Sequence, residues 1–175
     1  MGVRASTAQA DLIGLEPQAL QELVGRAGVP DRQRRMRASQ LWNWLYVRGA
    51  TGFDEMTPLP KDLRRRLGEI VSFERPTLVR EQVSGDGTIK WLLRLRGGQE
   101  VETVFIPEAD RGAVCVSTQV GCSLTCSFCH TGTMPLVRNL TAGEILAQIL
   151  IARDRLAEWP APAKRRLSHI VVMGM

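Results

Sequence analysis

The chain of 175 residues has no run of the roughly 18 apolar residues that a membrane-spanning helix requires. Its first ten residues, MGVRASTAQA, contain no apolar core of the kind found in a secretory signal peptide. It also has no internal repeat and no low-complexity tract. These absences argue against membrane and secreted classes, so we expect a cytoplasmic protein with no membrane partner.

Cysteine and histidine are scarce, with four and two copies respectively. In a cytoplasmic chain, a few cysteines favour metal binding or redox catalysis over a framework of structural disulfides. The 44% hydrophobic and 23% charged content is typical of a globular protein that buries a core. The formal charge of +5 permits an anionic partner such as nucleic acid without requiring one.

Apolar residues recur at helical spacing three times in the N-terminal part of the chain, and each segment begins or ends with a Pro or Gly signal. The predicted helices cover approximately residues 17–27, 35–48 and 60–71. We therefore predict a helical accessory domain over residues 11–72, preceded by a flexible tail over residues 1–10.

From about Phe73 the pattern changes to short β-rich segments separated by turn signals. Ser84–Gly87 and Gly97-Gly98 are typical of tight turns between strands. The predicted strands cover residues 77–83, 89–95 and 101–106. We interpret residues 73–112 as an antiparallel β meander.

The last third of the chain has the order strand, loop, helix, strand. A strand begins at Ala113, and Thr141 with Glu144 forms a capping box that starts a helix. His169–Met173 has the pattern of a buried strand. This βαβ order predicts an α/β fold in which residues 113–175 start a partial (β/α) barrel. Because one such unit leaves its sheet edge and inner face bare, we expect a truncated chain.

Three cysteines, Cys122, Cys126 and Cys129, lie within eight residues in the predicted loop. Four-iron clusters normally take four cysteine ligands, so three leave one iron open to bind a further molecule. Phe128, between the last two cysteines, can shield such a cluster and pack on a bound adenine. The spacing favours an iron–sulfur cluster.

A structural zinc site is the alternative from the residues alone. Zinc requires four ligands in tetrahedral geometry. Cys115 is a candidate fourth ligand, but no Cys-x-x-Cys pair accompanies it. His130 is adjacent to Cys129 and can hardly share a metal with it.

The spacing Cys122-x-x-x-Cys126-x-Phe128-Cys129 resembles that of the radical-SAM superfamily. The surrounding segment VETVFIPEADRGAVCVSTQVGCSLTCSFCHTG, followed by RNLTAGEI, closely resembles the RlmN family. That family comprises dual-specificity adenine-C2 methyltransferases of ribosomal and transfer RNA. The resemblance runs from about residue 11 to the last residue, and Leu41-Trp42-x-Trp44 is similar to the family's accessory domain.

The resemblance implies that the three loop cysteines ligate a [4Fe-4S] cluster, whose open iron binds S-adenosyl-L-methionine. It implies catalytic roles for two further residues. Glu102 would remove the C2 proton of adenine, and Cys115 would resolve a protein–RNA crosslink through a transient disulfide. The implied partners are ribosomal RNA, tRNA and an electron donor for the cluster, and the full-length protein is expected to be a monomer.

The residues themselves leave other roles open for these two side chains. Glu102 lies within the apolar segment Val101–Phe105, in surroundings where a carboxylate can serve as a general base. Strand alternation instead favours a solvent-facing Glu102. For Cys115 the alternative is a small buried core residue.

The sequence also departs from the family. The cysteine that family members methylate on themselves has no counterpart among the four here, and the family's Gly-Glu-Pro segment would begin where Val171–Met175 ends. We therefore expect the chain to be inactive by itself. Two rival functions remain: the related C8-adenine methyltransferase of antibiotic resistance, and a non-catalytic, metal-stabilised RNA-binding module.

Weaker signals concern RNA binding and loop order. Basic runs at Arg32–Arg37, Arg64–Arg66 and Lys164–Arg166 are candidates for contact with RNA phosphates. Solvated helix faces are the alternative for each run. Arg138 and Asn139 follow the cysteine loop and are candidates to order it, with a role at the helix start as the alternative.

Overall fold

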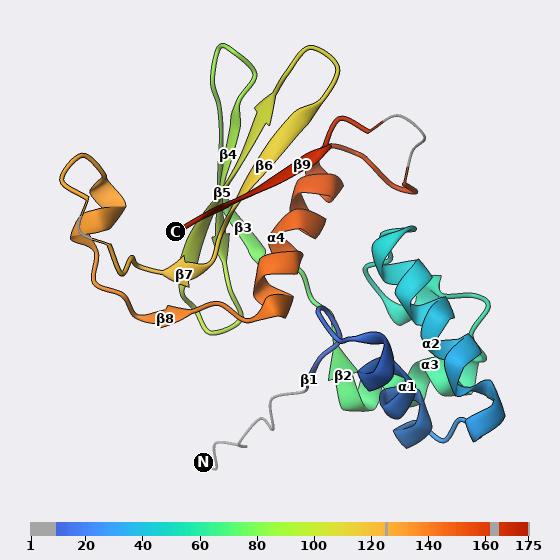
Figure 1. Cartoon of the computed structure of the whole chain (residues 1–175). Coiled ribbons are helices and arrows are strands. Elements are labelled where there is room, and N and C mark those ends of the chain that lie inside the picture. Colours follow the sequence, from blue (N-terminus) through green and yellow to red (C-terminus); the bar gives the residue numbers. More distant parts are fainter. Residues whose placement is uncertain (1–9, 125, 162–164, 175) are drawn as a thin grey trace, which may run out of the picture. The chain divides into compact units, whose positions relative to one another are not determined.

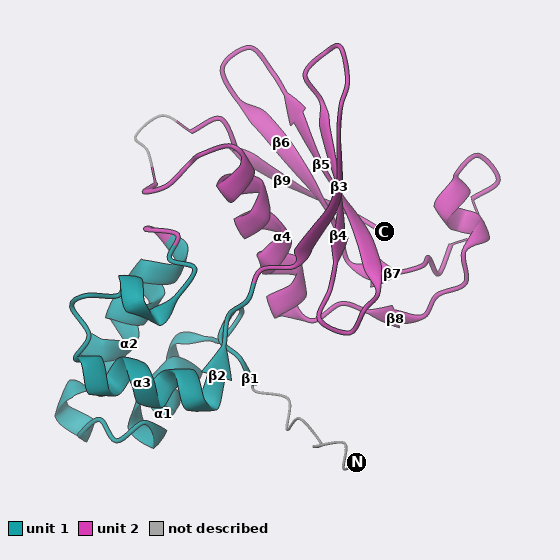
Figure 2. Cartoon of the chain, turned by 180° about the vertical axis from the view of Figure 1, so that it is seen from behind, with its two compact units in different colours: residues 1–46, 50–74 teal, residues 47–49, 75–175 magenta. Residues whose placement is uncertain are grey.

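A computed structural model of the chain describes residues 10–124, 126–161 and 165–174 (Figure 1). The chain divides into two compact units (Figure 2). The first comprises Met1–Tyr46 and Ala50–Glu74, and the second comprises Val47–Gly49 and Arg75–Met175. No helix in the described ranges is long and apolar enough to cross a membrane.

The first unit is a small helical bundle. Its helices are α1 (Pro17–Arg26), α2 (Asp31–Tyr46) and α3 (Lys61–Ile70), with a short 3₁₀ turn, η1 (Phe53–Glu55). Pro17 starts α1 at the position where its missing N–H costs nothing. Asp31 starts α2 about four residues earlier than the apolar spacing predicted, and its carboxylate pairs with Arg34 at 2.7 Å.

Besides η1, two short strands of this unit were not predicted. Two-residue strands, β1 (Ala10–Asp11) and β2 (Val71–Ser72), pair in parallel and join the two ends of the unit's sequence. A strand of two residues is too short to produce an alternating pattern, so periodicity could not have found it.

The second unit contains a five-stranded sheet in the order β3-β4-β5-β6-β9. The strands are β3 (Thr77–Val83), β4 (Ile89–Arg94), β5 (Glu100–Pro107), β6 (Gly112–Ser117) and β9 (His169–Met173). The first four are antiparallel, and β6 pairs with β9 in parallel. This mixed sheet confirms the predicted α/β class, with a meander that leads into one βαβ unit.

Helix α4 (Ala142–Arg155) crosses over between β6 and β9 and packs on one face of the sheet (Figure 1). Alternate residues of the strands face it and lose nearly all contact with water. The buried apolar residues of this core include Trp91, Leu93, Val101, Phe105, Val114, Val116, Ile151 and Ala152. Each large side chain buried in this way contributes about 1.5–3 kcal/mol to stability before entropy is counted.

The prediction of a buried β9 was wrong. Ile170, Val171 and Val172 are 54%, 47% and 66% exposed. β9 is the last strand of the sheet and bonds only to β6, so one of its edges has no partner strand among the described residues.

Candidate functional site: the cysteine loop

The cysteine loop leaves the sheet at the carboxyl end of β6 on a short two-stranded stem. β7 (Gln119–Val120) pairs with β8 (Arg138–Asn139), and Figure 1 shows the loop standing out beyond these two strands. The Val137 N–H donates to the Val120 carbonyl at 2.8 Å, and the Cys122 N–H donates to the Met134 carbonyl at 3.2 Å. The loop therefore has two defined arms, an outgoing one through β7 and a return one through β8.

Two glycines make the tight loop possible. Gly121 has a φ of +76°, and a Cβ there would lie 2.0 Å from the Pro135 carbonyl oxygen. A Cβ on Gly132 would lie 2.8 Å from the Cys126 carbonyl oxygen. Because real Cβ atoms do not approach so closely, any other residue would force the two arms apart.

The backbone of the loop directs N–H groups toward its cysteine sulfurs. The Leu124 N–H donates to Cys122 Sγ at 3.4 Å. The pKa of the Cys129 thiol lies below its ordinary value, chiefly because the Gly132 N–H bonds to it, with a smaller contribution from Thr131. Both interactions favour the thiolate, which is the form that binds metals.

The three cysteines share one loop, but their sulfurs are not gathered as a finished ligand set. All four cysteines of the chain are free thiols and partly exposed. Among the residues that the structure describes, no three Cys, His, Asp or Glu side chains are grouped closely enough to hold a metal ion. The donor chemistry nevertheless fits a cluster bound by thiolates, with three thiols on one short loop and a lowered pKa at Cys129.

The loop meets the end of the parallel strand β9. The Gly174 carbonyl accepts from the N–H groups of Thr118 and Gln119 at 3.2 and 2.9 Å. A Cβ on Gly174 would lie 3.2 Å from Cys122 Sγ. Cys122 therefore lies beside the carboxyl ends of both parallel strands, where sites in α/β folds are usually built.

Glu102 and Cys115 lie on the sheet face opposite α4. Val104 pairs in register with Cys115, and Glu102 is two residues from Val104 on the same side of β5. Glu102 therefore lies on the same face of the sheet as Cys115, two residues along β5 from the residue that pairs with Cys115. The sequence predicted a solvent-facing Glu102 from alternation and an apolar environment from its neighbours. The prediction from alternation was correct, because the Glu102 side chain is 36% exposed and pairs with Lys90 Nζ at 3.0 Å.

Phe128 is 92% exposed at the tip of the loop. Its aromatic face is therefore available to a ligand. His130 begins the 3₁₀ turn η2 (His130–Thr133), directly after Cys129.

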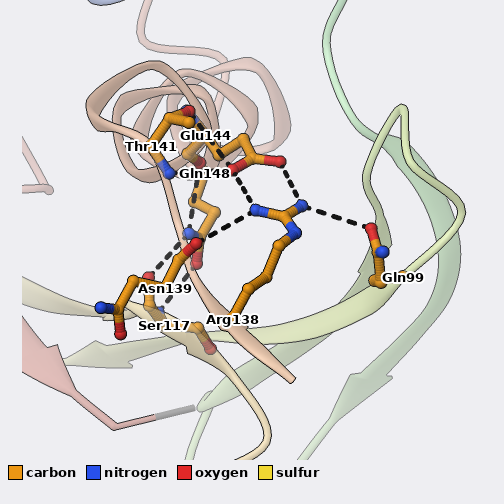
Figure 3. Close-up of polar contacts among 7 residues, drawn as sticks. All are labelled: Gln99, Ser117, Arg138, Asn139, Thr141, Glu144 and Gln148. Atoms are coloured by element: carbon orange, nitrogen blue, oxygen red, sulfur yellow. Dashed lines mark hydrogen bonds and ion pairs between the residues drawn. The ribbon is translucent and has the colours of Figure 1, made fainter. Parts of the chain in front are cut away.

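A buried glutamine holds the end of β6, from which the outgoing arm of the loop begins (Figure 3). Gln148, on α4, is 0% exposed. Its Oε1 accepts from the Ser117 N–H at 2.8 Å and from the Thr103 hydroxyl at 2.9 Å. Its Nε2 donates to the carbonyls of Ser117 at 2.9 Å and Glu144 at 3.2 Å. All four hydrogen-bonding positions of the amide are used, and Ser117 is held as a neighbouring strand would hold it.

Arg138 and Glu144 hold the return arm (Figure 3). Their two parallel bonds measure 2.7 and 2.8 Å. The pKa of Glu144 lies below its ordinary value, chiefly because Arg138 bonds to its carboxylate, while partial burial opposes that shift. The predicted capping box is confirmed, since Glu144 also accepts from the Thr141 N–H at 2.9 Å.

Sequence reasoning proposed Arg138 as an ordering residue but missed Gln148. The available signal was a long polar residue four positions after Glu144, inside an otherwise apolar stretch of helix. Such a residue faces the same side of the helix as Glu144 and must be bonded if it is buried.

Three arginines of the first two basic runs, including Arg34, pair with carboxylates of their own helices. Arg65 bonds to Asp62 and Glu69, and Arg66 bonds to Asp62. Lys164 and residues 1–9 of the predicted tail lie outside the described residues, while Ala10 belongs to β1.

Comparison with known proteins gives concordant matches. Residues 10–72 match the family model described as the ribosomal RNA large subunit methyltransferase N-terminal domain. The chain is 54% identical to the dual-specificity RNA methyltransferase RlmN of Rhodopseudomonas palustris (strain BisA53), an alignment that covers 96% of this chain and 45% of that protein. It is 56% identical to the protein of the same description from Rhizobium meliloti (strain 1021), covering 94% of this chain and 44% of that one.

A solved structure agrees with these relatives. The crystal structure of a radical SAM methyltransferase from Sphaerobacter thermophilus superposes with a TM-score of 0.81 at 46% identity. The match covers 94% of this chain and 46% of that chain. The chain spans about half the length of the curated relatives it matches.

Proposed function

Because this chain belongs to the RlmN family, we propose that it carries the cluster-binding part of a radical-SAM methyltransferase that modifies C2 of adenosine in large-subunit ribosomal RNA and in tRNA. The single observation that carries the proposal is the three-cysteine loop at the carboxyl ends of β6 and β9. A loop in that position can hold a cofactor at the mouth of a barrel.

In this proposal Cys122, Cys126 and Cys129 ligate a [4Fe-4S] cluster. When bound, the cluster supplies the electron that cleaves S-adenosylmethionine. The chain contributes the thiolates, the N–H groups that stabilise them, and the glycine turns that bring the arms of the loop together. Phe128, exposed at the tip, would pack on the adenine of the cofactor.

Glu102 and Cys115 are proposed as the catalytic residues. The Glu102 carboxylate would accept the C2 proton of adenine, and Lys90 pairs with that carboxylate on the open face of the sheet. Cys115 lies on the same face, one strand away. It is a free thiol, as a residue that forms only a transient disulfide would be.

The proposed partners follow from the relatives and from the first unit. The relatives are described as RNA methyltransferases, and the family model matches the helical unit. We therefore propose ribosomal RNA and tRNA as substrates, an electron donor for the cluster, and a cytoplasmic protein that is a monomer at full length.

Anaerobic reconstitution with iron and sulfide tests the cluster. We expect about four irons per chain and a charge-transfer band in the visible spectrum. Cys122→Ala should lose both signals. Cys115→Ala is the matched control, because it removes a thiol outside the loop, and it should keep them. Stoichiometric zinc without iron would instead support the metal-stabilised RNA-binding module.

The catalytic residues are tested in a protein completed to the length of its relatives. Glu102→Gln should stop the release of methylated RNA, and unchanged release would remove its role as base. Cys115→Ala should accumulate a covalent protein–RNA adduct, whereas normal turnover would reject its role as the resolving thiol.

A further inference from the structure

We propose that Arg138 is a positioning residue for the cysteine loop, and that its pair with Glu144 determines how firmly the loop retains a metal cluster. This inference rests on the cluster site proposed above and extends it to residues that are not ligands. The role follows from where Arg138 lies in the chain and from what it joins.

Arg138 lies at the base of the return arm, close to the first ligand. In the β7–β8 ladder it pairs with Val120, two residues before Cys122. Its guanidinium makes two parallel bonds to Glu144, and the two side chains are only 32% and 20% exposed. A bidentate arginine–carboxylate pair with little exposure fixes direction as well as distance.

The same carboxylate is fixed from the helix side. Glu144 accepts from both the N–H and the hydroxyl of Thr141 at the start of α4. Arg138 Nη2 also bonds to Gln99 at 3.2 Å, in the turn between β4 and β5 (Figure 3). The return arm is therefore joined to the start of a helix and to a sheet turn through one side chain.

Helix α4 holds the outgoing arm as well. Gln148 lies one turn beyond Glu144, bonds to the Glu144 carbonyl, and holds both backbone groups of Ser117 at the end of β6. Two residues on neighbouring turns of one helix thus fix the two arms relative to each other. We call the pair Arg138–Glu144 the return clamp.

Without the return clamp, the short stem and the buried Leu140 just after it would be left to hold the return arm. That stem has two-residue strands and a few backbone bonds, including Leu140 N–H to the Thr118 carbonyl at 2.8 Å. A stem of this size opens easily. Opening would separate Cys122 from the other two ligands, and a cluster bound through three thiolates would be released faster.

A purely structural role would predict a different result, and the chain offers a matched control. Arg155 forms a similar two-bonded pair with Glu81 at the opposite end of α4, with distances of 2.9 and 3.0 Å. Arg155→Met removes the same type of pair from the same helix, at the end away from the loop. If the return clamp only stabilises the unit, the two variants should behave alike.

The experiment reconstitutes the 175-residue chain anaerobically and measures the release of iron to ferrozine below the melting temperature of each variant, with far-UV circular dichroism as the check of folding. We expect Arg138→Met to release iron about tenfold faster than the wild type, and to alter the electron paramagnetic resonance spectrum of the reduced cluster. Arg138→Lys, which keeps the charge but not the two parallel bonds, should be intermediate. Arg155→Met should match the wild type.

The outcomes separate the two proposals. If the wild type takes up no iron, the proposed cluster and the role of the return clamp both fail. If the wild type holds iron and Arg138→Met releases it at the wild-type rate, or no faster than Arg155→Met, the positioning role alone is overturned. If Arg138→Met is misfolded, Arg138→Lys decides, because wild-type release from that folded variant overturns the role.

Discussion

The amide of Gln148 illustrates how one side chain can decide a local structure. It is buried, and it satisfies the backbone N–H and carbonyl of Ser117 at the residue where β6 ends. Both groups would lose these hydrogen bonds if the amide were removed. An unpaired buried backbone group costs about 1–3 kcal/mol, which is more than the net gain from an ordinary hydrogen bond.

Replacement of Gln148 by methionine, which keeps the volume and removes the polar atoms, should lower the free energy of unfolding by about 2–4 kcal/mol. Denaturant unfolding followed by circular dichroism measures the change. The exposed Gln82 on β3 provides the control, since Gln82→Met should change the free energy by less than about 0.5 kcal/mol. Equal effects of the two variants would show that the bonds to Ser117 contribute little.

The pair between Glu144 and Arg138 is expected to make the stability of the folded chain depend on pH. Arg138 holds its pKa in the folded state below the ordinary value of 4.5. The ionised carboxylate therefore contributes stability that is fully present above pH 4.5 and is lost as the pH falls through the lower folded-state value. The difference in melting temperature between the wild type and Glu144→Gln should be largest at neutral pH and should narrow in acid.

Melting curves at a series of pH values test this expectation. Glu108→Gln, which removes an exposed carboxylate paired with Arg111, is the control and should show a small difference. A difference for Glu144→Gln that stays constant down to the acid limit would contradict the assignment.

At the scale of elements, the loop depends on a backbone conformation that only glycine adopts freely. Gly121 and Gly98 have similar φ values of +76° and +83°. They differ in their surroundings, because a Cβ at Gly121 meets the Pro135 carbonyl oxygen at 2.0 Å, whereas nothing lies within 4 Å at Gly98. Comparison of Gly121 with Gly98 therefore separates the free-energy cost of the left-handed backbone conformation from the cost of the clash with Pro135.

Gly98→Ala should lower stability by about 1–2 kcal/mol, the cost of a left-handed conformation for a residue with a Cβ. Gly121→Ala should carry that cost and also push the two arms of the loop apart. Limited proteolysis with mass spectrometry should then detect faster cleavage within residues 121–137 for Gly121→Ala alone. Equal cleavage rates in both variants would show that the close approach to Pro135 does not hold the arms together.

At the scale of the whole molecule, the two edge strands of the large sheet differ in how well they are protected against pairing with another chain. The exposed side chains of β3 combine Val79 and Val83 with the charged Arg80 and Glu81, whereas Ile170, Val171 and Val172 form an unbroken apolar run on β9. An apolar edge strand with unpaired backbone groups is a template for association with another chain.

The chain is expected to self-associate as its concentration rises, and Val172→Lys should reduce that association. Val83→Lys introduces the same charge on the opposite edge strand and should leave association unchanged. Sedimentation velocity over a concentration series distinguishes the variants. If Val172→Lys associates as strongly as the wild type, β9 is not the surface involved.

The sequence by itself determined the features that depend on neighbours along the chain. These include the bounds of β3 and β9, the capping box at Thr141, and the cysteine spacing that pointed to the RlmN family. Each results from turn preferences, periodicity or ligand spacing, which act over a few residues. The meander pattern followed by the order strand, loop, helix and strand in turn predicted the mixed sheet, because that order builds a βαβ unit.

Only the tertiary structure decided the features that depend on distant partners. The apolar pattern of β9 resembled a buried strand, but its exposure depends on which strand lies beside it. The Lys90 partner of Glu102 and the bonds of Gln148 to Ser117 depend on strand register and helix packing. The physical reason is that hydrogen bonding and burial between residues far apart in sequence are set by how the elements assemble, and no local pattern records that arrangement.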